Sequence, residues 1–264
     1  MQSGGVGILN ECKQIAKEGF LSGFSIKIIA VILMTIDHIG LLFFNYLPAE
    51  IYVAMRVLGR LSMPLFAFMI AEGARYTRSK ARYLGLIGAM AVICTLFTYI
   101  YYGSVSLNIF GSFLFALIII FLYDIGIKSL QSYKKTNQTD FALRGVGSLL
   151  AAALVIAALY MALLYLPNYI NFGIDYGIFG VLLPLSAYII KHKWARFIPF
   201  ICCLACMAWD VSSEMGAMQY LSLLSVLILL CYNGTRGLNV LKYGFYIYYP
   251  LHLGILELIL LAIA

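Results

Sequence analysis

Nine apolar segments constrain the fold of this chain more than any other feature. A transmembrane helix needs about 20 predominantly apolar residues, because the hydrocarbon core of a bilayer is about 30 Å thick. Inside that core every backbone N–H and C=O group needs a partner within the segment, so such segments form helices. We therefore predict an all-α membrane protein, a bundle of about nine transmembrane helices. The predicted spans are residues 26–47, 51–73, 83–102, 109–127, 145–166, 174–190, 197–211, 218–232 and 243–263.

Composition agrees with a membrane protein. The chain is 63% hydrophobic and 11% charged, whereas soluble domains average about 45–50% apolar and 25% charged residues. Its net charge of +7 would suit nucleic acid, but the basic clusters flank apolar segments, as topology signals do. We therefore predict no nucleic-acid partner. No linker rich in proline, serine or charge interrupts residues 26–264, which are predicted to form a single transmembrane domain.

The basic residues also predict the orientation. With the N-terminus in the cytoplasm, the inner segments carry 16 of the 18 lysines and arginines, and the outer loops carry none. The outer side holds Glu50, Asp175 and Glu214 instead. The positive-inside rule then places the N-terminus in the cytoplasm and the C-terminus outside.

Two polar stretches lie outside these spans. Residues 1–25 are predicted to be a cytoplasmic tail in which residues 8–20 form an amphipathic helix at the membrane interface; a frayed tail is the alternative. Residues 129–143 are polar and are predicted to be a loop.

Asp37 and His38 lie side by side in the middle of the first apolar segment. An ionisable side chain at bilayer mid-depth costs about 2.5–3.5 kcal/mol on insertion scales. Such residues persist where they face a protein interior or a wet cavity and have a partner or a chemical task. This pair is therefore the first candidate for a functional site.

Counting along the helices places three polar residues at one depth. Asp37, Arg60 and His252 each lie ten residues from a charge at the membrane surface, or about 15 Å along a helix. The flanking charges are Lys27, Glu50 and Lys242. Three helices are therefore expected to converge on one polar layer, and Arg56 lies in the same span as Arg60. Pro64 and Pro250 are expected to bend two of these helices beside the layer.

The polar layer has both structural and catalytic interpretations. Asp37 with Arg60 can form a buried ion pair that fixes helix register, and each histidine can be an interhelical tether. Two histidines, a carboxylate and an arginine at one depth favour chemistry. A histidine oriented by a carboxylate accepts and returns a proton, and a nearby arginine stabilises a developing oxyanion.

Other polar residues mark the openings of the predicted bundle. Those at the outer helix ends are Asn108, Asp175 and Tyr176. Glu72 lies near the inner end of the second span. The inner turn of residues 233–237 includes Asn233 and Arg236, and its donors can bind phosphate; a basic turn that only follows the positive-inside rule is the alternative.

Six motifs, in order along the chain, resemble one family. They are FSIKIIAVILMTIDHIG, GRLSMPLFAFMIAEGARYTR, SLNIF, DYGIFG, YNGTRG and KYGFYIYYPLHLGIL, between residues 24 and 256. Together they resemble the TraX family of membrane acetyltransferases, named for an enzyme that acetylates the N-terminus of a conjugative pilin. More loosely, they are similar to lysosomal heparan-glucosaminide N-acetyltransferase and bacterial polysaccharide O-acyltransferases.

This resemblance implies a multi-pass enzyme of the bacterial cytoplasmic membrane, with acetyl-CoA as cytoplasmic donor and a peptide or glycan acceptor reached from the far side. It implies no metal. Carried over by motif, His38 is the catalytic base, Asp37 its orienting partner and His252 the second histidine. The candidate substrate- and acyl-CoA-binding residues are Arg56, Arg60, Glu72, Asn108, Asp175, Tyr176, Asn233 and Arg236.

Two other classes of function compete with acyl transfer. In a proton-coupled transporter or flippase, Asp37, His38 and His252 would relay protons. Such proteins carry inverted repeats, and the sequence has no such symmetry. A non-catalytic membrane scaffold would have to bear the cost of several buried polar groups without a chemical task.

Overall fold

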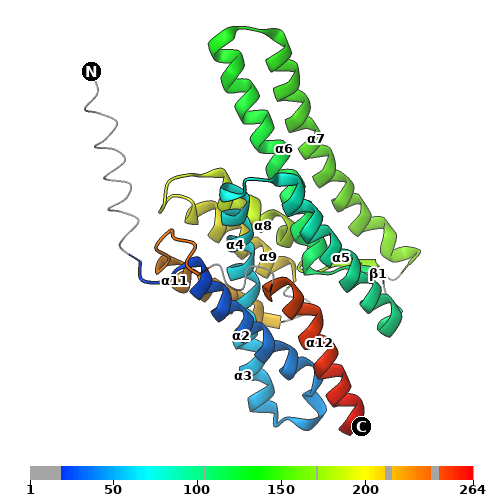
Figure 1. Cartoon of the computed structure of the whole chain (residues 1–264). Helices are drawn as coiled ribbons and strands as arrows, with labels where there is room; N and C mark the ends of the chain where they lie inside the picture. The colour runs from blue at the N-terminus through cyan, green and yellow to red at the C-terminus, as the bar shows by residue number, and fades with distance from the viewer. Residues whose placement is uncertain (1–18, 104, 171, 212–215, 239–243, 264) are drawn as a thin grey trace. The chain divides into compact units, whose positions relative to one another are not determined.

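The computed structural model describes residues 19–263, apart from residues 104, 171, 212–215 and 239–243 (Figure 1). Most of the predicted interfacial helix at residues 8–20 lies outside the described residues. The described chain is mostly helical. Six of its helical segments are long and apolar enough to cross a membrane, and three further apolar helices are shorter. This agrees with the predicted helical, multi-pass membrane protein.

The chain divides into two compact units. The first unit comprises Met1–Met69 and Met215–Ala264, and the second comprises Ile70–Glu214.

The first unit is built on three helices that meet along α2. Helix α2 (Gly23–Leu42) packs against both α3 (Ala49–Gly59) and α12 (Gly244–Ile263). The other elements of this unit are η1 (Phe44–Tyr46), the first half of α4 (Ser62–Tyr76), η3 (Gly216–Leu224) and α11 (Ser225–Leu230).

The predicted second span is broken in the middle. Helix α3 ends at Gly59, Arg60 is its C-cap, and α4 begins at Ser62. Pro64 explains the break, because proline has no N–H to continue the helical hydrogen bonds but fits the first turn of a new helix. Helix α12, in contrast, continues through Pro250. The break places Arg60 at a helix end inside the first unit.

The second unit contains a long helical hairpin. Helices α6 (Ile109–Thr136) and α7 (Thr139–Tyr165) pack side by side (Figure 1). The other elements are the second half of α4, α5 (Lys80–Tyr102), β1 (Val105–Leu107), η2 (Leu166–Asn168), β2 (Phe172–Ile174), α8 (Gly177–Ile189) and α9 (Phe197–Asp210). Strands β1 and β2 pair in parallel, a small element that the sequence did not predict.

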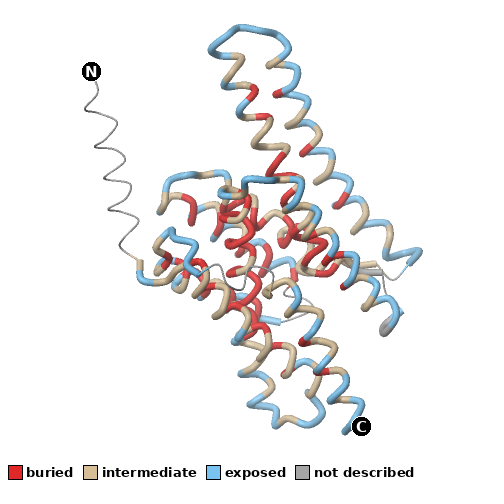
Figure 2. The backbone as a smooth tube through the Cα atoms, in the orientation of Figure 1, coloured by how far each residue is buried: buried red, intermediate tan, exposed pale blue. Residues whose placement is uncertain are grey.

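The prediction of a loop at residues 129–143 is wrong. Helix α6 runs to Thr136 and α7 begins at Thr139, so only a short turn separates them. The 28 residues of α6 span about 42 Å at about 1.5 Å per residue, more than the thickness of a bilayer core. The polar ends of this hairpin are exposed (Figure 2).

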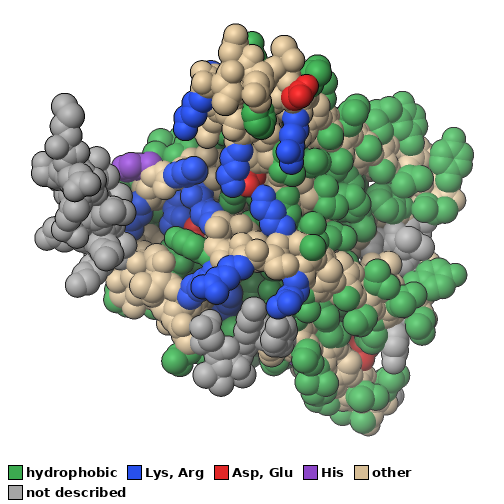
Figure 3. Space-filling view, turned by 45° about the horizontal axis from the view of Figure 1, so that its top comes forward, with side chains coloured by type: hydrophobic (Ala, Val, Ile, Leu, Met, Phe, Trp, Pro, Cys, Tyr) green, Lys and Arg blue, Asp and Glu red, His purple; other side chains and the backbone are tan. Residues whose placement is uncertain are grey.

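Lysine and arginine side chains can be seen on the face of the molecule shown in Figure 3. In the second unit, Lys80 and Lys128 both contact one oxygen of Asp124, at 2.8 and 2.9 Å. Lys80 also lies over the Phe121 ring, 4.9 Å from its centre.

Candidate functional site

A hydrogen-bonded pair of histidines lies in the first unit, between α2 and α12. His38 Nδ1 is 2.7 Å from His252 Nε2, and His252 is 5% exposed. The ring centres are 4.9 Å apart. The sequence predicted that these two residues share one depth, and the structure brings them into direct contact.

The partners of the pair determine its protonation pattern when both rings are neutral. His252 Nδ1 lies 2.9 Å from the carbonyl oxygen of Tyr248. A carbonyl only accepts hydrogen bonds, so His252 Nδ1 carries a proton and its Nε2 is an acceptor. His38 Nδ1 therefore donates to His252, which leaves the lone pair of His38 on Nε2. This nitrogen is the atom that can act as a base.

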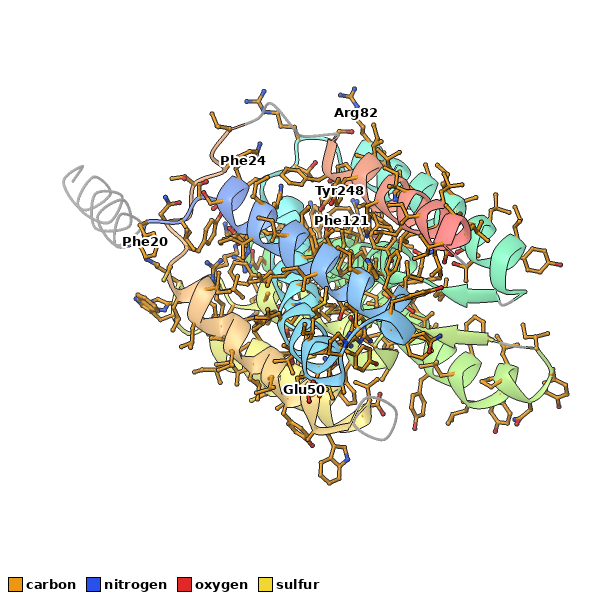
Figure 4. All side chains as sticks on the ribbon, turned by 90° about the horizontal axis from the view of Figure 1, so that it is seen from below. Phe20, Phe24, Glu50, Arg82, Phe121 and Tyr248 are labelled. Carbon is orange, nitrogen blue, oxygen red and sulfur yellow. The ribbon has the colours of Figure 1, made fainter. Side chains whose placement is uncertain are left out.

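Tyrosines hold the two rings from several sides. The Tyr248 ring stacks on His252 with 5.0 Å between centres and an interplanar angle of 6°. Tyr249 lies edge-on to both histidines, at 5.9 and 5.5 Å. Thr35 Oγ1 donates to the Val31 carbonyl at 2.8 Å and accepts from the Tyr248 hydroxyl at 2.8 Å. Tyr248 lies on α12 beside α2 (Figure 4), so the hydroxyl pair ties the two helices together next to the histidines.

Asp37 forms a separate ionic cluster with two arginines. Its carboxylate lies 2.8 Å from Arg56 and 2.8 Å from Arg60, and Arg60 Nη2 contacts both carboxylate oxygens. Arg60 is 3% exposed and Asp37 8%. Gly59 permits this close approach of α3 to α2, because a Cβ there would collide with the Asp37 side chain. One carboxylate between two arginines leaves a net charge of +1 in this cluster.

The prediction that Asp37 orients His38 needs correction. The described contacts of the Asp37 side chain go to arginines, and His38 is oriented by His252. Consecutive helical residues point about 100° apart, so neighbours in sequence face different partners. The relay through Asp37 and both histidines, which the transporter alternative assumes, has no support in these contacts.

Gln219 belongs to the ionic cluster but was not predicted from the sequence. Its side chain is fully buried, and its Oε1 lies 3.5 Å from Arg60 Nη1, so η3 joins the cluster. An amide inside the apolar run of residues 218–232 was the available signal, although an amide alone does not reveal its partner.

The remaining candidates of the first unit lie in the turn of residues 233–237. Asn233 Oδ1 accepts from both the N–H and the hydroxyl of Thr235, at 2.9 and 2.7 Å. The carbonyls of Thr235 and Arg236 accept from the N–H groups of Gly23 and Phe24 at the start of α2. The Arg236 side chain is exposed. The turn thus caps α2, and the described contacts do not join it to the histidine pair.

Glu72 belongs to the second unit, where it forms another buried ionic cluster. It contacts Arg196 at 2.7 Å and Arg75 at 3.6 Å. Arg75 Nη2 in turn donates to carbonyls at the end of α8, those of Ala187, Tyr188 and Ile190, at 2.8–2.9 Å. These contacts favour a structural role for Glu72.

The outer candidates of the second unit also have local structural partners. Asn108 caps α6 by accepting from the N–H groups of Phe110 and Gly111, and its amide donates to the Ala91 carbonyl and Thr95 hydroxyl. The Asp175 N–H donates to Leu107, which extends the β1–β2 pairing. Tyr176 has a positive φ of 62° at the start of α8.

Together, the long apolar helices indicate a multi-pass membrane protein, and the histidine pair gives it a polar site between two of these helices. Comparison with known proteins identifies the family. Residues 22–260 match the family described as TraX protein, and the chain belongs to this family.

Two curated relatives extend this finding. The "Probable fimbrial assembly protein FimC, serogroup H1" of Dichelobacter nodosus is 25% identical over 248 residues, which are 89% of this chain and 94% of that protein. "Uncharacterized protein RP591" of Rickettsia prowazekii (strain Madrid E) is 30% identical over 169 residues, or 64% of this chain and 55% of that protein. No solved structure matches the chain significantly.

Proposed function

We propose that the chain is a membrane acyltransferase that moves an acetyl group from cytoplasmic acetyl-CoA to an amine or hydroxyl acceptor presented from the extracytoplasmic side. It would act in the bacterial cytoplasmic membrane as a bundle of nine spans, with the N-terminus inside and the C-terminus outside. The one-sided distribution of lysine and arginine supports this orientation.

The observation that carries the proposal is the histidine pair. His38 has its Nδ1 bonded to His252 and its Nε2 lone pair available, within a span that is otherwise apolar. A half-buried imidazole with a fixed tautomer suits general base catalysis, which contributes about 10²–10⁴-fold to rate in enzymes.

In the direct route, the acetyl group passes from the thioester to the acceptor with His38 Nε2 as the base. The acceptor nitrogen or oxygen attacks the thioester carbonyl while His38 Nε2 takes its proton. The tetrahedral intermediate collapses, the C–S bond breaks, and His38 returns the proton to the CoA sulfur. In the alternative route His38 Nε2 attacks the thioester carbonyl, the C–S bond breaks, and CoA leaves as the thiolate. The acceptor then attacks the acetyl-histidine, the N–acetyl bond breaks to restore His38, and the acceptor's proton passes to the CoA sulfur.

The ionic cluster of Asp37, Arg56 and Arg60 supplies electrostatic support. Asp37, the carboxylate of this cluster, directly precedes His38 in α2, and the two arginines give the cluster a net positive charge. Positive charge fixed in a dry environment stabilises a developing oxyanion more than water does. The ion pairs hold both guanidinium groups in place, so little reorganisation is needed during the reaction.

The acceptor is proposed from the relatives. One relative carries a name that refers to fimbrial assembly, and the sequence motifs resemble a family named for acetylation of a pilin N-terminus. A peptide N-terminal amine is therefore the first acceptor to test, with a surface glycan hydroxyl as the alternative.

The test uses the full chain in lipid nanodiscs with labelled acetyl-CoA and an amine-bearing peptide. We expect acetyl-CoA to raise the melting temperature and label to appear on the peptide. His38→Ala should lower the rate of transfer by at least about 100-fold while melting near the wild-type temperature. If acetyl-CoA neither stabilises the protein nor is consumed with peptide or glycan acceptors, the proposal fails. A labelled acyl-enzyme trapped near neutral pH in the absence of acceptor would select the acetyl-histidine route.

A further inference from the structure

Three buried polar side chains lie in one line along η3 and the start of α11, in the first unit. Gln219 and Ser222 belong to η3, Ser225 begins α11, and all three are 0% exposed. Side chains three residues apart eclipse one another in a 3₁₀-helix. The nine residues of η3 exceed the usual length of about three or four for such a helix. This conformation aligns the three polar groups, which we call the polar row.

The polar row begins at the ionic cluster of Asp37 and its two arginines. Gln219 Oε1 is 3.5 Å from Arg60 Nη1. From Gln219 the row follows the chain toward the turn of residues 233–237, which the positive-inside rule assigns to the inner side. At about 2.0 Å per residue, the row is about 12 Å long. It therefore leads from the cluster toward the inner end of the first unit.

The polar row lacks partners within the protein. Across the described part of the chain, Gln219 Nε2 and the hydroxyls of Ser222 and Ser225 are buried without a hydrogen-bond partner. A helical serine commonly donates to a carbonyl one turn earlier, as Ser186 does to Leu183 at 2.7 Å. The two serines of the row make no such bond. Leaving a buried polar group unpaired is destabilising, so three in one line point to a ligand that satisfies them.

The chemistry and spacing of the polar row suit water. An amide N–H and two hydroxyls need a ligand that both accepts and donates, and a buried water makes about three such hydrogen bonds. Neighbouring members of the row are about 6 Å apart along the helix axis, close to the span of one water with a hydrogen bond of about 2.8 Å to each side. The ionic cluster carries a net charge of +1, and a buried charge is less costly where water surrounds it.

We propose that the polar row binds a file of ordered water molecules, one between Gln219 and Ser222 and one between Ser222 and Ser225. The file hydrates the Asp37 cluster from the inner side of the first unit. It goes beyond acyl transfer, because it solvates a buried charge whatever reaction takes place nearby. Its tests need no transfer assay, so the water file and the proposed function can fail separately.

The melting temperature of the full chain in nanodiscs tests the water file by its sign. Ser222→Ala and Ser225→Ala each take a partner from a bound water and should lower the melting temperature, whereas loss of a hydroxyl without a partner would raise it. Ser62→Ala is the matched control, because Ser62 is buried in the same unit and donates to the Ala30 carbonyl at 2.8 Å. Its shift calibrates the loss of a direct bond. Higher melting temperatures in the two row variants overturn the proposal.

A double-mutant cycle tests whether neighbours share a water. Ser222→Ala combined with Ser225→Ala should lower the melting temperature by less than the sum of the single shifts, because either substitution already disturbs the shared molecule. Ser62→Ala combined with Ser225→Ala, a pair outside one row, should give additive shifts. Additive shifts within the row contradict a shared water.

A crystal structure from a lipidic phase, at a resolution that shows ordered water, locates the molecules directly. We expect density between Gln219 and Ser222 and between Ser222 and Ser225. Hydroxyls that donate to nearby carbonyls, with no density between them, overturn the proposal.

A small anion is the other ligand that a net positive cluster attracts. The melting temperature is therefore followed in chloride against gluconate at constant ionic strength, and we expect no difference. A saturable rise with chloride that is lost in Gln219→Leu would assign the row to an anion and overturn the water file.

Discussion

Each unit of this protein buries one carboxylate between two arginines, but the surroundings of the two clusters differ. In the first unit Asp37 contacts Arg56 and Arg60 at 2.8 Å. In the second, Glu72 contacts Arg196 at 2.7 Å and Arg75 at 3.6 Å. The next residue after Asp37 is His38, which pairs with His252. Beside Glu72, Arg75 is instead committed to carbonyls at the end of α8.

A buried ionic cluster is therefore weak evidence for catalysis. Charged groups inside a membrane protein satisfy one another, and both clusters do so. The difference lies in the neighbouring groups. Only the first cluster, among the described residues, adjoins an imidazole pair with a nitrogen lone pair left over for chemistry. We therefore expect substitutions in the first unit to change catalysis and those in the second to change stability.

The largest expected effect is loss of transfer in His38→Ala. Removing the proposed base should lower kcat by about 10²–10⁴-fold, the usual contribution of general base catalysis. The measurement is labelled acetyl transfer at saturating acetyl-CoA, alongside the melting temperature. His252→Gln should give a smaller loss, because glutamine can still accept from His38. Wild-type activity in His38→Ala would contradict the assignment of a catalytic base beside the first cluster.

Asp37→Asn should destabilise the protein most. Removing one partner of a buried ion pair leaves uncompensated charge and costs about 3–5 kcal/mol; here two arginines lose their carboxylate. Reversible unfolding in mixed detergent micelles measures the change. Adding Arg56→Met to Asp37→Asn removes one of the stranded charges and should recover part of the loss. If the double variant is less stable than the single variant, unpaired arginine charge is not the cause of the destabilisation in Asp37→Asn.

Arg75→Met tests the second cluster. Hydrogen bonds that involve a charged group contribute about 1.5–3 kcal/mol, so stability should fall by about this amount while kcat per folded molecule stays near wild type. Arg78, an exposed arginine of the same basic stretch, provides the control, Arg78→Met, which should alter neither quantity. A fall in kcat comparable to that of His38→Ala would place Arg75 in the catalytic site and contradict a purely structural role for the second cluster.

Asp175 provides a carboxylate without an arginine, since no ion pair involves it within the described part of the chain. It lies between β2 and α8, outside the apolar helices. Burial raises the pKa of Asp175 to about 6, although a hydrogen bond from the Ile109 N–H acts in the opposite direction. The folded protein then binds the carboxyl proton of Asp175 more tightly than the unfolded chain does, because aspartates in an unfolded chain have a pKa of about 3.9.

The contribution of Asp175 to stability is therefore complete below pH 4 and declines as pH rises toward and through about 6. The slope should stay below about 1.4 kcal/mol per pH unit, the value for one proton. Unfolding measured between pH 4.5 and 7.5 checks this, and Asp175→Asn should flatten the slope. An identical slope in that variant would assign the pH dependence to another group.

The sequence predicted some parts of this molecule well because their cause is local. Apolar runs of about 20 residues form helices wherever a bilayer surrounds them. A bend was expected at Pro64, and the helix is broken just before it, whereas α12 continues through Pro250. Counting residues also placed His38 and His252 at one depth. The prediction failed for residues 129–143, where polar composition indicated a loop. Helices α6 and α7 continue through most of this stretch, because a helix that packs against a neighbour does not end at the membrane surface.

By itself, the sequence determined that the chain is a helical membrane protein of the TraX family, since hydropathy, charge distribution and motif order depend on residue identity alone. A polar layer at mid-depth stays a prediction. The tertiary structure decided which polar groups meet. In the structure Asp37 pairs with two arginines and His38 pairs with His252. The direction of a side chain depends on helix rotation and on the helices packed around it. The fold also brought Gln219 to Arg60, which no spacing in the sequence indicated. The proposed base, His38 Nε2, follows from those pairings.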